Sequence, residues 1–112
     1  GWHGNSLCVQ APWNAACNNE EVVYDVALSA TQPERVTLHA SKLVAGTPEW
    51  MGDLDLAYDS TAGAWSGDFQ GRRVSVRWTY RVQGDSLFGQ VAELPSGRVA
   101  RNVTATRVKG AK

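Results

Sequence analysis

Two charged residues at apolar-facing positions are the first candidates for chemistry. Glu93 lies in the strand expected before Pro95, and Arg101 lies in the strand expected over residues 98–108. A hairpin between these strands would bring the two side chains together diagonally, and a buried charge is tolerated when it is paired. The pair could be a structural ion pair near a rim, or it could anchor the polar head of a ligand. It could also serve a small barrel enzyme, an isomerase or hydrolase, with Glu93 as a desolvated base.

Aromatic residues at apolar-facing positions are the second candidate. Three inferred turns align Tyr58, Trp65 and Trp78 as one row of rings, which could stack on a flat apolar or sugar-like ligand. The alternative is a packed core with no cavity. Gly67 and Gly89 either leave space for a ligand or accommodate a neighbouring ring. The full candidate ligand-binding set is Trp50, Tyr58, Trp65, Phe69, Trp78, Tyr80, Glu93 and Arg101.

The two histidines offer little catalytic chemistry. His39 falls on the polar-facing side of its segment, which favours an exposed histidine. His3 could bind Cu(II) or Ni(II) together with the terminal amine if Gly1 is a free N-terminus. Neither histidine is placed for a serine triad, and two histidines cannot form a three-histidine zinc site. We therefore assign no catalytic residue, no metal and no cofactor.

Cys8 and Cys17 are the only cysteines, and their spacing favours a disulfide that closes a short loop. The alternative is a pair of buried thiols. A disulfide would indicate a periplasmic or secreted protein. The sequence begins without a recognisable signal peptide, so we expect it to be a mature or trimmed form.

Strict alternation over residues 73–82 identifies the clearest element, a strand with one apolar and one polar face. The segment 64–70 alternates in the same way, and Gly71-Arg72 between the two predicts a tight two-residue hairpin. That turn would place Trp65 near Trp78. Further strands are expected at 1–9, 21–28, 35–44, 53–58, between the turn at 84–85 and Pro95, and at 98–108. Residues 45–51, with Pro48 and Trp50, are expected to form a loop.

Length and charge narrow the class of protein. The 112 residues suit one domain, and eleven basic residues balance eleven acidic ones. A net charge of zero argues against nucleic acid as the main partner, and no apolar run approaches the length of a membrane span. Eight antiparallel strands with short connections predict an all-β, up-and-down β-barrel, the alternative being a sandwich. An eight-stranded barrel can be filled by side chains or can hold one small ligand.

Trp2, within Gly1-Trp2-His3-Gly4, and Arg107 near the end of the chain would meet on closure of the barrel. In this respect the chain resembles the lipocalin-like (calycin) barrels, and it reads like small exported bacterial proteins. The resemblance implies that Trp2 packs under Arg107 and plugs one barrel end. We expect an exported protein that binds a small apolar or aromatic molecule. The alternatives are the barrel enzyme using Glu93 and Arg101, or a structural or interaction module with a filled core.

Overall fold

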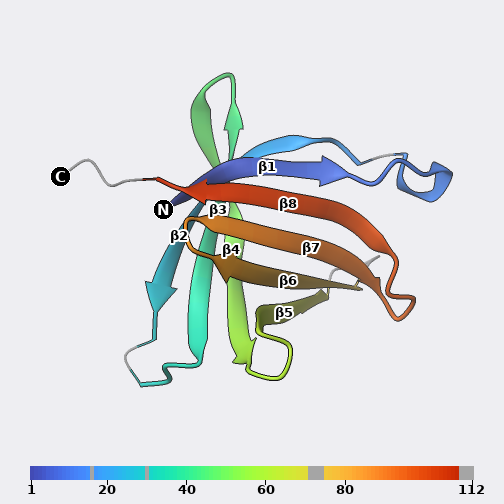
Figure 1. Cartoon of the computed structure of the whole chain (residues 1–112). Helices are drawn as coiled ribbons and strands as arrows, with labels where there is room; N and C mark the ends of the chain where they lie inside the picture. Colours follow the sequence, from blue (N-terminus) through green and yellow to red (C-terminus); the bar gives the residue numbers. More distant parts are fainter. Residues whose placement is uncertain (16, 30, 71–74, 109–112) are drawn as a thin grey trace.

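The computed structural model describes residues 1–15, 17–29, 31–70 and 75–108. Within them, eight antiparallel strands follow one another around a closed barrel, and the last strand pairs with the first (Figure 1). The predicted all-β, up-and-down barrel is confirmed. The strands are β1 (Trp2–Cys8), β2 (Glu20–Leu28), β3 (Arg35–Val44), β4 (Thr47–Asp59), β5 (Ala64–Gln70), β6 (Ser75–Gln83), β7 (Ser86–Leu94) and β8 (Val99–Arg107), with a short 3-10 helix η1 (Pro12–Asn14) after β1.

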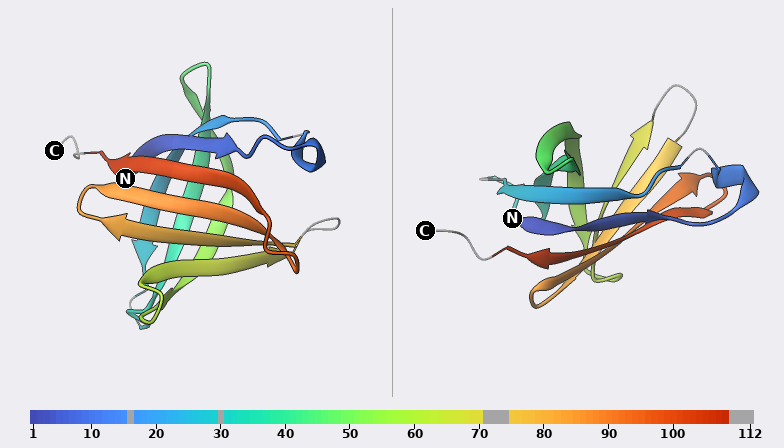
Figure 2. Two further views of the ribbon diagram at one scale, coloured as in Figure 1. Left: turned by 45° about the vertical axis from the view of Figure 1, so that its right-hand side comes forward. Right: turned by 90° about the horizontal axis from the view of Figure 1, so that it is seen from above.

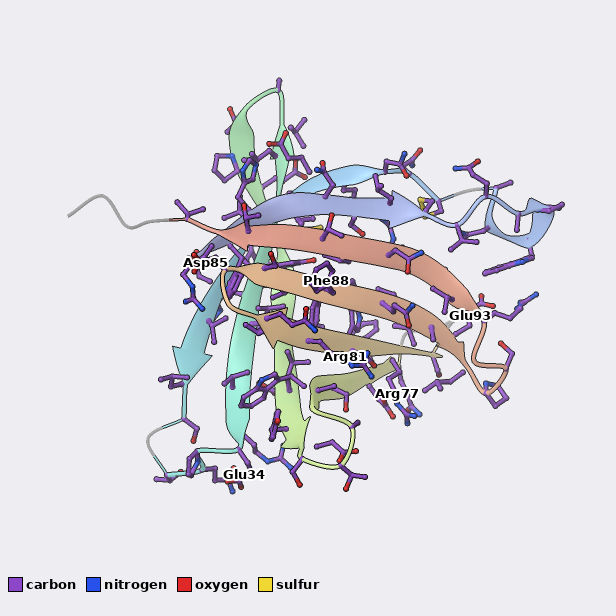
Figure 3. All side chains as sticks on the ribbon, viewed as in Figure 1. Glu34, Arg77, Arg81, Asp85, Phe88 and Glu93 are labelled. Atoms are coloured by element: carbon purple, nitrogen blue, oxygen red, sulfur yellow. A yellow bond between two sulfur atoms is a disulfide. The ribbon has the colours of Figure 1, made fainter. Side chains whose placement is uncertain are left out.

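Alternation along the strands separates the core from the outer surface. In β6, Tyr80 is buried while Arg77 and Arg81 project from the outer face (Figure 3). Trp65 and Trp78 are partly buried and pack against the core cluster. The arginines therefore stay in water and the indole rings face inward, as the sequence predicts. Most of the cluster is formed by Trp2, Val22, Tyr24, Val36, Leu38, Leu56, Tyr80, Leu87 and Val103.

The β3–β4 hairpin is longer than expected. Its pairing continues to Val44 and Thr47, so the loop predicted for residues 45–51 is wrong. Ala45 and Gly46 both have positive φ angles, 52° and 81°, as the two-residue turns that join antiparallel strands require. The hairpin extends beyond the barrel wall, and Pro48 and Trp50 lie in β4 (Figure 1).

The register between β5 and β6 also differs from the prediction. Trp65 pairs with Tyr80, and Trp78 pairs with Gly67, a shift of two residues. The physical reason is the length of the connection, because Gln70 and Ser75 are the last paired residues and four residues separate them. The predicted Gly71-Arg72 turn, together with Arg73 and Val74, lies outside the described residues.

Other predicted pairings are confirmed. Tyr58 lies opposite Trp65, and Tyr80 lies opposite Gly89. A Cβ atom on Gly89 would lie 2.7 Å from Cδ1 of Tyr80, so this glycine accommodates a ring and leaves no space for a ligand. Gly67 permits a close crossing of strands, because its added Cβ would overlap the backbone oxygen of Asp55.

The ladder of paired residues between β4 and β5 is the shortest in the barrel. It contains only three residue pairs, from Ala57–Ser66 to Asp59–Ala64, whereas β3 and β4 pair along nearly their whole length. Beyond these pairs the two strands diverge (Figures 1 and 2). Within the described part of the chain, no helical segment has the length and apolar character needed to cross a bilayer.

Candidate ligand-binding cavity

A cavity of about 580 Å³ lies at the end of the barrel where β2, β6 and β8 begin. This volume falls within the range of small-molecule sites, about 300–1,000 Å³. Most of its wall is apolar, with a small polar group on one side. The apolar wall includes Val22, Leu54, Phe69, Val76, Trp78 and Val91, and the polar residues are Ser6, Asn14, Glu20, Asp53 and Arg101.

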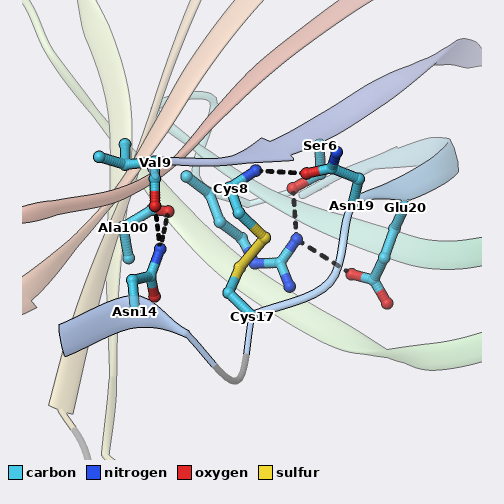
Figure 4. The surroundings of a disulfide bond; sticks show 9 residues. Ser6, Cys8, Val9, Asn14, Cys17, Asn19, Glu20 and Ala100 are labelled. Atoms are coloured by element: carbon cyan, nitrogen blue, oxygen red, sulfur yellow. Dashed lines mark hydrogen bonds and ion pairs between the residues drawn. A yellow bond between two sulfur atoms is a disulfide. The ribbon is translucent and has the colours of Figure 1, made fainter. Parts of the chain in front are cut away.

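Arg101 is the centre of the polar side. Its Nη1 donates to Ser6 Oγ at 3.1 Å and lies 3.4 Å from Glu20 Oε1. The second carboxylate oxygen of Glu20 lies 3.7 Å from Lys42 Nζ. Ser6 is buried, and the Arg101 side chain is only 19% exposed. Figure 4 shows Ser6 and Glu20 beside the disulfide. Pairing with Glu20 makes a guanidinium tolerable at this depth.

Two tyrosines lie at the centre of the barrel. The rings of Tyr24 and Tyr80 meet edge to face with centroids 5.7 Å apart, and both residues are buried. Burial raises the pKa of Tyr24 and raises that of Tyr80 well above its ordinary value. Tyr24 lines the 580 Å³ cavity, whereas Tyr80 lines a second cavity of about 450 Å³ towards the opposite end. These rings form a floor between the two cavities.

The segment joining β1 to β2 borders the cavity. The predicted disulfide between Cys8 and Cys17 is confirmed, and Cys17 lines the cavity. The side-chain amide of Asn14 donates to the carbonyl oxygens of Val9 and Ala100, each at 2.9 Å (Figure 4). These bonds fasten the disulfide loop to the start of β8. The loop is thus held in place from both sides.

The predicted contact between Glu93 and Arg101 is wrong. Glu93 Oε1 instead accepts from Arg98 Nη2 at 2.6 Å, and the guanidinium of Arg98 lies over the ring of Trp13. The cause is an extra residue in β8, because Val91 pairs with Arg101 while the next residue of β7 pairs with Val99. This bulge places Arg98, not Arg101, beside Glu93. The pairing of Glu93 with Arg101 on which the alternative barrel enzyme depends is therefore not formed.

The remaining predicted site residues do not share one cavity. Phe69, Trp78 and Arg101 line the 580 Å³ cavity, and Trp65 and Tyr80 line the 450 Å³ cavity. The shifted β5–β6 register explains this division, because Trp78 lies one row away from Trp65. The predicted row of Tyr58, Trp65 and Trp78 is therefore corrected to Tyr58, Trp65 and Tyr80.

Two predicted aromatic residues are largely exposed. The ring of Tyr58 contacts Trp65 with centroids 5.0 Å apart, but Tyr58 is 43% exposed. Trp50 is 69% exposed, and its indole N–H donates to Asp53 at the cavity wall. Neither ring lines the two cavities described above.

Sequence reasoning missed Ser6 and Glu20. The sequence does indicate that these residues face the interior. Ser6 lies on the same strand face as Trp2, and Glu20 lies on the same strand face as Val22 and Tyr24. A polar residue on an apolar phase is informative, since burial of such groups requires partners.

Both histidines pair with carboxylates on the surface. His3 contacts Glu21, and His39 Nδ1 lies 2.6 Å from Asp53 Oδ1. The hydrogen bond from His39 lowers the pKa of Asp53. Among the described residues, no three His, Cys, Asp or Glu side chains are grouped to hold a metal ion.

Comparison with known proteins adds no assignment. No family model matches this sequence, and no curated protein matches it.

Proposed function

We propose that the protein binds a small apolar or aromatic molecule in the 580 Å³ cavity. The observation that carries this proposal is the composition of the wall, in which Trp78 and Phe69 join aliphatic side chains around a few convergent polar groups. Small-molecule sites have this composition, with apolar surface providing affinity and polar groups fixing orientation. A cavity of this size supports ligand binding over a filled core.

The disulfide loop supports the same function. Asn14 and Cys17 border the cavity, and their bonds to neighbouring strands hold the rim in one arrangement. A rim that is ordered before binding lowers the conformational entropy lost when a ligand enters. The disulfide also supports an exported protein, because such bonds persist in oxidising compartments. The stacking of Arg107 on Trp2 supports a calycin-like relationship, since that group shares this contact.

Fluorescence titration tests the proposal. Phenylnaphthylamine, a neutral aromatic probe, should bind saturably and quench Trp78 emission. Trp78→Leu should weaken binding, because it removes the largest ring of the cavity wall. The matched control is Trp50→Leu, which alters an exposed ring outside the cavity and should leave affinity unchanged. A titration without saturable binding would favour the filled-core alternative.

A further inference from the structure

We infer, building on the proposed function, that the cavity selects aromatic acids, and that Arg101 binds their carboxylate or a comparable oxyanion. Three features support this ligand class: the unused donors of Arg101, the pairing of both carboxylate oxygens of Glu20, and the position of Arg101 relative to Trp78.

Arg101 has N–H donors that are not used in the described part of the chain. A guanidinium carries five N–H groups on three nitrogens. Among the residues that the structure describes, only Nη1 has polar partners, Ser6 and Glu20. Within the described residues, Nε and Nη2 have no protein partner, although the side chain is only 19% exposed and lines the cavity. Two adjacent nitrogens with parallel N–H groups match the two oxygens of a carboxylate.

The acid beside Arg101 is already engaged. Glu20 contacts Arg101 through one oxygen and Lys42 through the other. Asp53, the other acid of the wall, is 44% exposed, and His39 and Trp50 both contact its Oδ1. A cationic ligand beside Arg101 would therefore compete with two protein cations for Glu20. An anionic ligand would meet unused donors, so the occupancy of these contacts favours an acid over an amine.

The barrel register places the apolar surface beside the guanidinium. Arg101 pairs with Val91 across β8 and β7, and Val91 pairs with Trp78 across β7 and β6. The three side chains thus occupy one row. Two strand spacings separate its ends by about 9–10 Å. A head group at Arg101 would leave a flat body of that length lying over Val91 against Trp78, which fits an aromatic acid.

Two probes with the same aromatic body test the inference. Phenylnaphthylamine is neutral, and anilinonaphthalene sulfonate adds one negatively charged sulfonate group to the same rings. Both are titrated against the full chain, and dodecanoate and dodecanol then compete for bound phenylnaphthylamine to test the carboxylate itself. The variant is Arg101→Gln, and the matched control is Arg81→Gln on the exposed face of β6. Near-ultraviolet circular dichroism establishes that each variant is folded.

We expect the native chain to bind the sulfonate at least about tenfold more tightly than the neutral probe, a factor equivalent to 1.4 kcal/mol. Dodecanoate should likewise compete better than dodecanol. Arg101→Gln should abolish both preferences and retain phenylnaphthylamine binding, while Arg81→Gln changes nothing. Equal or weaker binding of the anions by the native chain overturns the inference and leaves the proposed function intact. If no probe binds at all, the proposed function itself fails. If Arg101→Gln does not fold, the relative affinities of the native chain for the anionic and neutral probes still test the inference.

Discussion

The guanidinium of Arg107 lies over the indole ring of Trp2, with its Cζ 4.5 Å from the ring centroid. The two residues are also direct partners in the ladder between β8 and β1. The contact therefore joins the last strand to the first at the point where the barrel closes. Trp2 is buried beneath the half-exposed arginine, so hydrophobic burial and cation–π attraction act on the same ring.

This arrangement predicts unequal effects from the two partners. Trp2→Ala should lower the free energy of unfolding by about 3–5 kcal/mol, because it leaves a cavity in the core. Arg107→Gln should cost about 0.5–1 kcal/mol, the size of an exposed cation–π contact. Urea unfolding measures both, with exposed Arg81→Gln as the control. An Arg107→Gln variant indistinguishable from Arg81→Gln would show that the stack contributes nothing.

The close approach at Gly67 predicts a larger effect than the one at Gly89. An added methyl at Gly67 would overlap the backbone oxygen of Asp55, whereas at Gly89 it would meet the ring of Tyr80. A backbone atom held in a strand cannot yield as readily as a ring. Gly89→Ala should cost about 1–3 kcal/mol, typical of overpacking, and Gly67→Ala should cost more. Equal midpoints for the two variants in urea unfolding would contradict this.

Much of the fold follows from the sequence, and the errors have local causes. Alternation of side chains identified the strands, and closure of the barrel identified the contact between Trp2 and Arg107. The turn at Ala45-Gly46 was missed because alanine gives no signal for a positive φ angle. The bulge in β8 was missed because one extra residue in a strand does not disturb its composition. That single residue gave Glu93 a different partner and changed the interpretation of the site.

Buried tyrosines predict loss of stability in alkali. Burial raises the pKa of Tyr24 and Tyr80 in the folded state, while in the unfolded chain they ionise near pH 10, about the ordinary value. The unfolded state thus loses protons first, and stability should fall as the pH rises above about 10. Tyr24→Phe and Tyr80→Phe should each flatten this decline. The exposed Tyr58→Phe is the control, and the measurement is the urea midpoint as a function of pH.

Two surface carboxylates should titrate at low pH for separate reasons. Arg77 donates to both oxygens of Asp68, at 2.7 and 3.0 Å, and lowers its pKa below the ordinary 3.8. The hydrogen bond between His39 and Oδ1 of Asp53 likewise lowers the pKa of Asp53. Both groups therefore favour the folded state above their ordinary pKa, and this contribution is lost as the pH falls through the lowered values. The effect on stability is small because both pairs are exposed.

Carbon-detected NMR titration separates the two pairs. Arg77→Gln should return the pKa of Asp68 towards its ordinary value and leave that of Asp53 lowered. His39→Gln should do the reverse. Each variant is the control for the other. A simultaneous shift of both carboxyl groups in either variant would indicate a general charge effect and contradict the pairwise assignment.

Asn14 fastens the disulfide loop, so its loss should affect both stability and binding. Its amide donates to Val9 and Ala100, and Asn14→Asp removes both donors while keeping the shape of the side chain. The carbonyl oxygen of Val9 would lose this donor, and that of Ala100 would keep only the bond from the backbone N–H of Val9. The loss should cost about 1–3 kcal/mol in urea unfolding. The matched control is Asn18→Asp on the exposed part of the same loop, which should leave stability unchanged.

Because the loop borders the cavity, Asn14→Asp should also speed the release of bound phenylnaphthylamine in stopped-flow measurements. Faster release from the Asn18→Asp variant as well would assign the effect to the added charge and not to the lost bonds.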